Sequence, residues 1–320
     1  MYDAVPSLVE ATTRVAAFPD GSVDTYQRVR ASDGTWLSKE AFRDAIVGTR
    51  SQGFRLDPHA VESGGQAVNA AQQAHALGDD VRLDGCLDDE RLTFPFETHS
   101  FGDPSLVTVH EFADGDITYA DISDDVADWS HEAFETVPEA DAYVCGNWAS
   151  VDGMTDTLGA LADRLDGGVF VFDPGDLTTA PAEEIRACTA ALGRLDDAVD
   201  VAVSVNGREL TAIADALTVA DEVRSVRDEA GVFAVVRHEA DAAAAATRAG
   251  EVVVDNFDPN GPTRRTGGGD RFSAGLAHGL AVGGDIGPAV ALGNCCASHY
   301  VATGTTATAD DIASLAAEQA

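Results

Sequence analysis

Short apolar runs alternate along the chain with longer stretches rich in alanine. The apolar runs, most of them rich in valine, lie at 15–18, 141–145, 168–172, 201–205, 232–236 and 251–254. The alanine-rich stretches, which have the composition of helices, lie at 66–77, 154–165, 181–193, 209–217, 240–249 and 288–302. Gly78, Gly167 and Gly250 follow three of these stretches and predict where three helices end. The alternation predicts an α/β fold whose mostly parallel central sheet is covered by helices.

Two segments break this alternation. Residues 24–60 and 93–120 carry strand-like patterns with turn signals between them. Asp114 and Gly115 stand between two alternating runs, which is a strong signal for a β-hairpin. We interpret both segments as inserts that form a small β-rich lid on a single domain, residues 1–320. Ordinary surface excursions are the alternative.

Charge changes the picture of where such a protein works. Of the 320 residues, 55 are acidic and 20 are basic, so the formal net charge is -35. Such a charge destabilises a compact state at low ionic strength, whereas a Debye length of about 3 Å in molar salt screens the repulsion. We therefore expect a halophilic protein in a salt-rich cytoplasm, without a nucleic-acid partner. An acidic protein that binds basic partners is the alternative, and the even spread of the acidic residues disfavours it.

Several chemistries are disfavoured because their motifs are absent from the chain. The five cysteines form no CxxC pair and no zinc pattern with histidine. The one lysine, Lys39, follows no glycine loop, so the sequence has no Walker-type P-loop. No GxGxxG segment follows a predicted strand, which disfavours a nicotinamide dehydrogenase. No run of about 18 apolar residues occurs, so we expect no membrane association.

The run TRRTGGGD at 263–270 carries the clearest chemical signal. Gly267, Gly268 and Gly269 let the backbone approach a ligand closely, and the helix that follows adds unpaired amides and the positive end of its dipole. Asp270 stands at the helix entrance, where a carboxylate can take the proton of a hydroxyl that attacks a phosphoryl group. The alternative is a glycine turn in which Asp270 caps the helix.

Two further segments accompany this run. SGGQAVN at 63–69 places Gly64 and Gly65 before a predicted helix, with Asn69 one turn into it. There the glycines would allow a ligand to approach the backbone, and the alternative is a plain helix start. VSVNGREL places Asn206 and Glu209 directly after a predicted strand, where they are equally consistent with a capping box.

In this order, the three segments resemble those of the ribokinase, or PfkB, family of carbohydrate kinases. The resemblance covers nearly the whole chain and implies a ribokinase-like three-layer core with a small β-rich lid. It implies that Gly64, Gly65 and Asn69 bind the sugar. It also implies that Gly267–Gly269 form an anion hole beside a general base, Asp270, the middle glycine replacing the family's usual alanine.

The resemblance assigns roles to four other residues. Asn206 and Glu209 would help to place phosphate and Mg²⁺, the metal being held by Glu209 indirectly through water. Asp24 looks like the family's substrate-binding aspartate, although its spacing from the preceding glycine is shorter than usual. Asn294 would line the pocket for the nucleotide's base, and VFDPGDL at 171–177 resembles the family's Asp-Pro segment.

One segment departs from the family. After the apolar run at 232–236 the family usually has a glycine-containing loop that helps to hold the nucleotide, whereas this chain reads RHEADAAAAATRAG. An arginine there could contact a phosphate. The departure leaves the donor open between ATP, which we favour, and ADP.

The resemblance therefore implies Mg²⁺-dependent transfer of a nucleotide's terminal phosphoryl group to a hydroxyl of a sugar or sugar acid. An ADP-dependent sugar kinase and a nucleoside kinase are the enzymatic alternatives. A catalytically silent protein that binds sugar or nucleotide is the third. The sequence leaves open the acceptor, any requirement for a monovalent cation and the oligomeric state, for which a homodimer through the lid is one arrangement.

Overall fold

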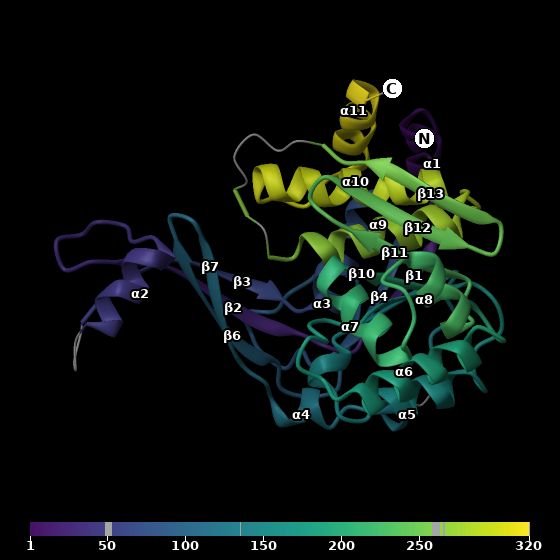
Figure 1. The fold of residues 1–320 in the computed structure, drawn as a ribbon, viewed down its shortest axis with the longest axis horizontal. Coiled ribbons are helices and arrows are strands. Elements are labelled where there is room, and N and C mark those ends of the chain that lie inside the picture. Colours follow the sequence, from purple (N-terminus) through teal and green to yellow (C-terminus); the bar gives the residue numbers. More distant parts are fainter. Residues whose placement is uncertain (49–52, 135, 258–262, 265, 320) are drawn as a thin grey trace.

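A computed structural model describes residues 1–48, 53–134, 136–257, 263–264 and 266–319. Within these ranges nine strands form the main sheet, in the order β13-β12-β11-β10-β9-β8-β1-β4-β5 (Figure 1). Neighbours from β11 to β5 pair in parallel, and β12 and β13 add an antiparallel edge. The strands are β1 Arg14–Phe18, β4 Asp80–Gly85, β5 Glu97–Ser100, β8 Ala142–Gly146, β9 Val169–Asp173, β10 Asp200–Val205, β11 Ala234–His238, β12 Ala242–Thr247 and β13 Gly250–Asp255.

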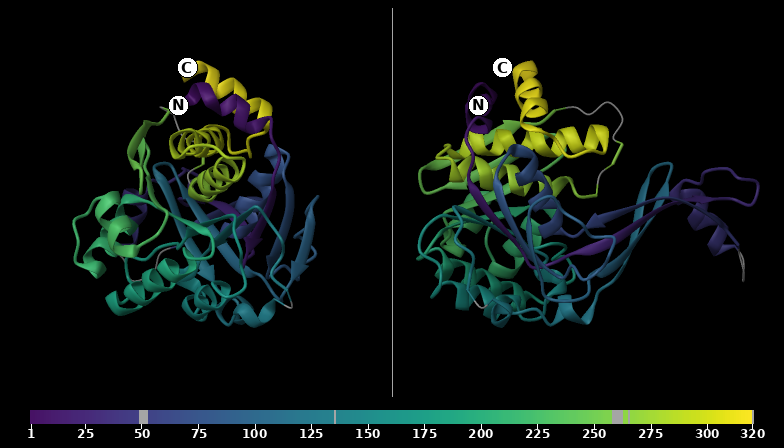
Figure 2. Two further views of the ribbon diagram at one scale, coloured as in Figure 1. Left: turned by 90° about the vertical axis from the view of Figure 1, so that its right-hand side faces the viewer. Right: turned by 180° about the vertical axis from the view of Figure 1, so that it is seen from behind.

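Helices cover both faces of this sheet, which gives the predicted three layers (Figure 2). One layer contains α1 Val5–Val9, α3 Gln66–Leu77, α9 Gly268–Ala281, α10 Ile286–Thr303 and α11 Ala309–Gln319. The other contains α5 Met154–Leu161, α6 Ala182–Leu195, α7 Gly207–Leu217 and α8 Val223–Ala230, and the short α4 Asp124–Ala127 precedes them. Alternation along β1 serves both cores, because Val15 and Ala17 face one layer while Ala16 and Phe18 face the other. No described helix has the length and apolar character to cross a membrane.

A second sheet of four strands, in the order β3-β2-β6-β7, projects from one side of the core (Figures 1 and 2). Its strands are β2 Ser22–Arg30, β3 Arg55–Gly64, β6 Ser105–Phe112 and β7 Gly115–Asp121, and α2 Lys39–Val47 lies at its far end. The hairpin predicted at Asp114 and Gly115 joins β6 to β7. Residues 97–100 are not part of this lid, because β5 pairs with β4 in the main sheet.

The alanine-rich stretch 240–249 was predicted as a helix, and this is wrong. Its alanines form β12, which pairs antiparallel with β11 and β13. Helix propensity is a weak prior, and pairing to both neighbours, with Ala243 and Ala245 fully buried, overrides it. Gly250 accordingly starts β13 instead of ending a helix.

Two other predicted helix ends differ from each other. Gly78 ends α3 in the left-handed conformation, with φ 97°, as expected. The helix predicted to end at Gly167 stops earlier, because α5 ends at Leu161. Gly167 instead adopts φ 83° shortly before β9 begins. The prediction that Gly167 ends a helix is therefore wrong.

Candidate active site

Polar residues stand at the carboxyl ends of five adjacent parallel strands. Asp20 and Asn147 follow β1 and β8, Asp173 ends β9, Asn206 follows β10, and His238 ends β11. Because parallel strands end at the same edge of a sheet, these residues lie along one rim of the molecule. The start of α9 joins them there, since α9 packs on β8 and β9 and Ser273 Oγ donates to Asp173 Oδ2 at 3.1 Å.

The glycine run forms the beginning of α9. Gly267 is the residue before the helix and has φ 89°, a conformation that glycine adopts without strain. Gly267 offers no side chain to cap α9, and the first backbone amides of a helix have no partner within the helix. The start of α9 therefore combines backbone amides with the positive end of the helix dipole, the features that an anion site requires. A Cβ on Gly269 would lie 3.2 Å from the His238 ring, so the space around the run is tight.

Asp270 lies in the first turn of α9 and is not its cap, so the alternative of a capping aspartate is not what the structure has. Its carboxylate is held by α3 instead. Asn69 Nδ2 donates to Asp270 Oδ2 at 2.7 Å, and Gln66 Nε2 lies 3.4 Å from Asp270 Oδ1. The same Gln66 nitrogen donates to Asp173 Oδ1 at 2.8 Å. Asp270 is therefore oriented by amide donors, with no cation paired to it among the described residues.

The other glycine segment has a different neighbour from the one expected. Gly65, with φ 99°, precedes α3, and the amides of Gln66 and Ala67 donate to the Asp20 carboxylate at 3.0 and 2.8 Å. Asn147 Nδ2 donates to the same carboxylate at 3.0 Å. Burial, only partly offset by these donors, raises the pKa of Asp20 to about 6. The N-terminus of α3 is thus capped by the carboxylate of Asp20.

The glycine at position 64 leaves room for the side chain of Asp24. A Cβ on Gly64 would overlap the Asp24 carboxylate, so the missing side chain lets this carboxylate approach the backbone closely. Ser22 Oγ donates to Asp24 Oδ1 at 2.5 Å, and burial raises the pKa of Asp24 to about 6. Asp24 and Asn69 both line a cavity of about 400 Å³ under the lid. Arg271 and Tyr300, from the C-terminal part of the chain, line the same cavity.

Asn206 and Glu209 form a capping box at the start of α7. Asn206 Oδ1 accepts from the amide of Glu209 at 3.1 Å, and the Glu209 carboxylate accepts from the amide of Asn206 at 2.9 Å. Burial raises the pKa of Glu209 to about 7. Burial, Asp270 and Glu209 together raise the pKa of Asp173 well above its ordinary range. Carboxyl groups thus crowd the rim beside the glycine run.

No group of three or more potential metal ligands is found among the described residues. The crowded carboxylates are nevertheless hard oxygen donors. Mg²⁺ keeps most of its waters and is bound through one or two carboxylates together with substrate phosphates. Asp173 and Glu209 therefore fit this mode of binding, and a closed protein cage is not required.

A second cavity, of about 300 Å³, lies on the other side of the glycine run. Gly268, Gly269, His238 and Asn294 line it. Asn294 is 1% exposed, and its Oδ1 has no hydrogen-bond partner among the described residues. Its Nδ2 donates to the hydroxyl of Tyr2 at 3.2 Å, and that hydroxyl donates to the Asp255 carbonyl at 2.7 Å. The chain's second residue therefore fixes the amide of Asn294.

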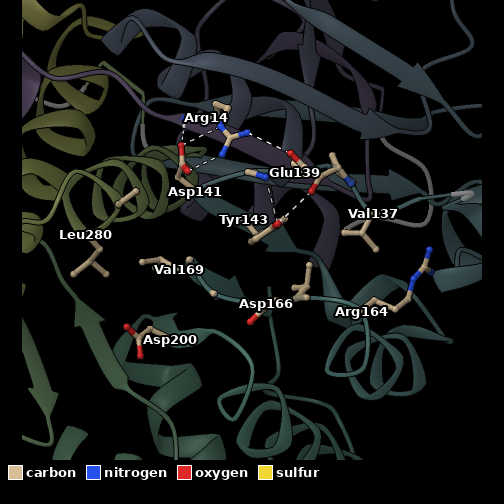
Figure 3. Close-up of a pocket in the computed structure, with 16 residues that line it drawn as sticks. Arg14, Val137, Glu139, Asp141, Tyr143, Arg164, Asp166, Val169, Asp200 and Leu280 are labelled. Carbon is tan, nitrogen blue, oxygen red and sulfur yellow. Dashed lines mark hydrogen bonds and ion pairs between the residues drawn. The ribbon is translucent and has the colours of Figure 1, made fainter.

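A cavity of about 670 Å³ opens at the opposite edge of the sheet, where the strands begin (Figure 3). Arg14 and Asp141 lie side by side in its lining, with their side chains 3.0 Å apart, and Tyr143 lies close by. Arg14 in it pairs with Glu139 and Asp141, and its glycines, Gly167 and Gly168, precede a strand instead of a helix. Its size therefore does not make it the candidate active site.

Comparison with known proteins decides the family. Residues 9–319 match the family of prokaryotic ketohexokinases. The chain belongs to this family. It is similar to the ketohexokinase of Haloferax volcanii, at 29% identity over 92% of the chain and 85% of that protein. The protein is therefore a carbohydrate kinase, as the resemblance of its three motifs implied.

Solved structures support the ribokinase-like fold. Fructokinase from Xylella fastidiosa with bound ATP superposes with a TM-score of 0.67 at 16% identity, covering 96% of the kinase and 98% of that protein. Nucleoside kinase from Methanocaldococcus jannaschii gives 0.67 at 14% identity over 96% and 100%. Ribokinase from Thermotoga maritima gives 0.66 at 16% identity over 95% and 98%. At such identities the likeness establishes the fold alone.

The segment that departs from the family forms the hairpin of β11 and β12. His238 ends β11 beside Gly269, and burial lowers its pKa to about 4, so its ring is neutral at pH 7. Arg237 lies on the neighbouring side, where its Cδ would be 3.9 Å from a Cβ on Gly207. The kinase thus places a neutral ring beside Gly269 and the Arg237 side chain next to the start of α7.

Sequence reasoning missed Asp20, Gln66, Asn147 and Arg271. A polar residue two positions after a predicted strand was the available signal for Asp20 and Asn147. Gln66 gave no signal, because its contact to Asp173 joins residues 107 positions apart. Arg271 did give one, since a cation in the first turn of a helix stands at the unfavourable end of the dipole.

Proposed function

We propose that the kinase transfers the terminal phosphoryl group of ATP to a hydroxyl of a ketohexose. The observation that carries the proposal is the position of the glycine run between two cavities. The cavity of about 300 Å³ contains Gly268 and Gly269, and the cavity of about 400 Å³ contains Asn69, whose amide holds Asp270. A donor in the first and an acceptor in the second would meet at these amides.

In this proposal Asp270 is the general base. As the acceptor oxygen attacks the phosphorus and the bond to the nucleotide breaks, the hydroxyl proton passes to the Asp270 carboxylate. The amides of Gly267–Gly269 stabilise the charge on the transferring oxygens. Asn69 keeps one carboxylate oxygen fixed, so that the other can face the hydroxyl.

Asp24 and Asn69 would orient the sugar, since both line the cavity under the lid. The lid strand β3 leads directly into Gly64 and Gly65, so movement of the lid is coupled to this site. Closure would exclude water, which otherwise competes with the sugar as acceptor.

Asp173 and Glu209 would hold Mg²⁺ through water beside the nucleotide phosphates. The metal would offset phosphate charge. Asn294 would accept a hydrogen bond from the nucleotide's base through Oδ1, the atom that has no partner among the described residues. ATP is favoured as the donor because the fructokinase of the same fold was solved with ATP bound. The acceptor class rests on the family and on the Haloferax relative.

A homodimer through the lid belongs to the same proposal. Leu106 and Tyr119 on the lid strands are 49% and 50% exposed, which would suit a surface covered by a second copy. Light scattering after size exclusion in molar KCl would measure the mass. A monomer would remove this part of the proposal and leave the chemistry untouched.

A phosphorylation screen tests the proposal. Fructose, an aldohexose, a sugar acid and a nucleoside would each be offered with ATP or ADP, in molar KCl and Mg²⁺. We expect the highest kcat/KM for the ketohexose with ATP. Preference for ADP or for a nucleoside would replace the proposed donor or acceptor. Binding without turnover, measured by calorimetry, would refute phosphoryl transfer altogether.

A further inference from the structure

Arg271 lies behind the glycine run, in a place where a cation is unfavourable. It follows Asp270 in the first turn of α9, near the positive end of the helix dipole. Its side chain is nevertheless buried, at 4% exposure, and desolvation lowers its pKa. No carboxylate forms an ion pair with it among the described residues, whereas Arg264, across the same cavity, pairs with Glu62. Such a costly placement calls for a specific contact.

That contact is the carbonyl of Gly267. Arg271 Nη1 donates to this oxygen at 3.0 Å. The guanidinium is held in turn by the Tyr300 ring, whose centroid is 3.6 Å from Arg271 Cζ, and by Thr306 Oγ1, 3.4 Å from both Nε and Nη2. The ring and the hydroxyl fix the guanidinium, and the guanidinium fixes the carbonyl.

Peptide planarity transmits this hold to the anion site. The carbonyl of Gly267 and the amide of Gly268 belong to one rigid plane. Gly267 has φ 89° and no Cβ, so its own backbone restrains that plane weakly. With the carbonyl oxygen held by Arg271, the Gly268 N–H points in one direction.

We propose that Arg271 is a positioning residue for phosphoryl transfer: it locks the Gly267–Gly268 peptide so that the Gly268 amide faces the transferring group. Its charge, which forms no ion pair among the described residues, also adds to the positive potential behind the glycine run. This inference rests on the proposed function. Arg271 acts through the backbone, so it should matter more in the transition state than for binding either substrate.

The test compares Arg271→Ala, Arg271→Lys and the wild type for kcat and for KM of both substrates. Loss of one oxyanion donor lowers kcat about 10²-fold or more, and we expect a fall on that order for Arg271→Ala with little change in either KM. Arg271→Lys keeps the charge but not the planar fork and should give an intermediate kcat. Added guanidinium chloride, below denaturing concentrations, should raise kcat of Arg271→Ala and not that of Asp270→Asn.

Arg227→Ala is the matched control, because Arg227 Nε also donates to a backbone carbonyl, that of Val232, at 2.8 Å and away from both cavities. Its kcat should equal the wild-type value. If Arg271→Ala does not fold, the comparison of Arg271→Lys with the wild type tests the inference. An unchanged kcat of Arg271→Lys then overturns it. Absence of rescue by guanidinium, or a loss confined to KM, also overturns it. A wild type without kinase activity would instead refute the proposed function before any variant is compared.

Discussion

Helices α3 and α9 of the kinase both begin after a glycine, but the surroundings of their first turns differ. Gly65 precedes α3 with φ 99°, and Gly267 precedes α9 with φ 89°. The first amides of α3 donate to the Asp20 carboxylate, whereas α9 begins without a side-chain cap. A helix start after a glycine therefore suits an anion, which is the Asp20 carboxylate at α3 and, in the proposed function, the transferring phosphoryl group at α9.

Asp173 connects the two helix starts. It accepts from Gln66 of α3 at 2.8 Å and from Ser273 of α9 at 3.1 Å. One helix start is thus a rigid support, and the other is the surface on which chemistry is proposed. Four predictions test this division, from the largest effect to the smallest.

Asp270→Asn should abolish most turnover and leave the fold intact. The amide cannot accept the hydroxyl proton, and loss of a general base typically lowers the rate about 10²- to 10⁴-fold. Steady-state kcat with ATP and fructose measures the loss, and circular dichroism in molar KCl is the control. Near-normal turnover would show that α9 does not carry the base.

Asp20→Ala should act on stability. It leaves the buried amides of Gln66 and Ala67 and the side chain of Asn147 without an acceptor, and an unsatisfied buried donor costs about 1 to 3 kcal/mol. Urea unfolding in constant molar KCl measures the change in free energy. Asp270→Asn should unfold near the wild-type midpoint in the same series. Equal losses in the two variants would contradict the division between α3 and α9.

Asp173→Asn should make unfolding less dependent on pH. The pKa of Asp173 is raised in the fold above the ordinary 3.8, so ionisation is harder in the folded than in the unfolded state. The wild type therefore loses stability as the pH rises above 3.8, through the range up to the raised pKa. The variant stays neutral at this position, so its free energy of unfolding should rise relative to that of the wild type between pH 5 and pH 8. The exposed Asp163→Asn serves as control, and an equal gain there would refute the assignment.

Gly268→Ala should have the smallest effect. Its φ is not positive, and a Cβ would meet only a methyl of Val301 at 3.2 Å, so kcat should stay close to the wild-type value. Alanine within a helix can add up to about 1 kcal/mol of stability. Gly267→Ala is the sensitive partner, because its Cβ would lie 2.9 Å from Arg271 Nη1 at φ 89°. Similar kcat values for the two variants would show that the Gly267 conformation is not required.

Much of the fold was predictable because its signals are local. The strands at 141–145 and 201–205 and the helix at 66–77 are present within about one residue of their predicted bounds. Segment 240–249 was not predictable in this way, because alanine suits a helix and a small-residue strand alike, and only pairing with β11 and β13 decides. Local composition is silent on such pairing.

The same distinction applies to the candidate site. Asp270 and the glycines are recognisable because their chemistry lies in consecutive residues. The position of Asp20 after a predicted strand marked it as a candidate, but its partner could not be predicted, since Gln66 lies 46 positions away. For Gly64 the sequence indicated a close approach but not the approaching group, which is the carboxylate of Asp24.

The contact of Tyr2 with Asn294 has a practical consequence for anyone who produces the enzyme. The hydroxyl of Tyr2 holds the amide that faces the candidate donor cavity, and its ring packs on Phe257 at 5.1 Å between centroids. An affinity tag fused ahead of Met1 would disturb the hydrogen bond between Tyr2 and Asn294. It would thereby change the apparent nucleotide preference, although every motif residue stays the same. Purification tags therefore belong after α11, and donor preferences measured on N-terminally tagged enzyme should be repeated once the tag has been cleaved.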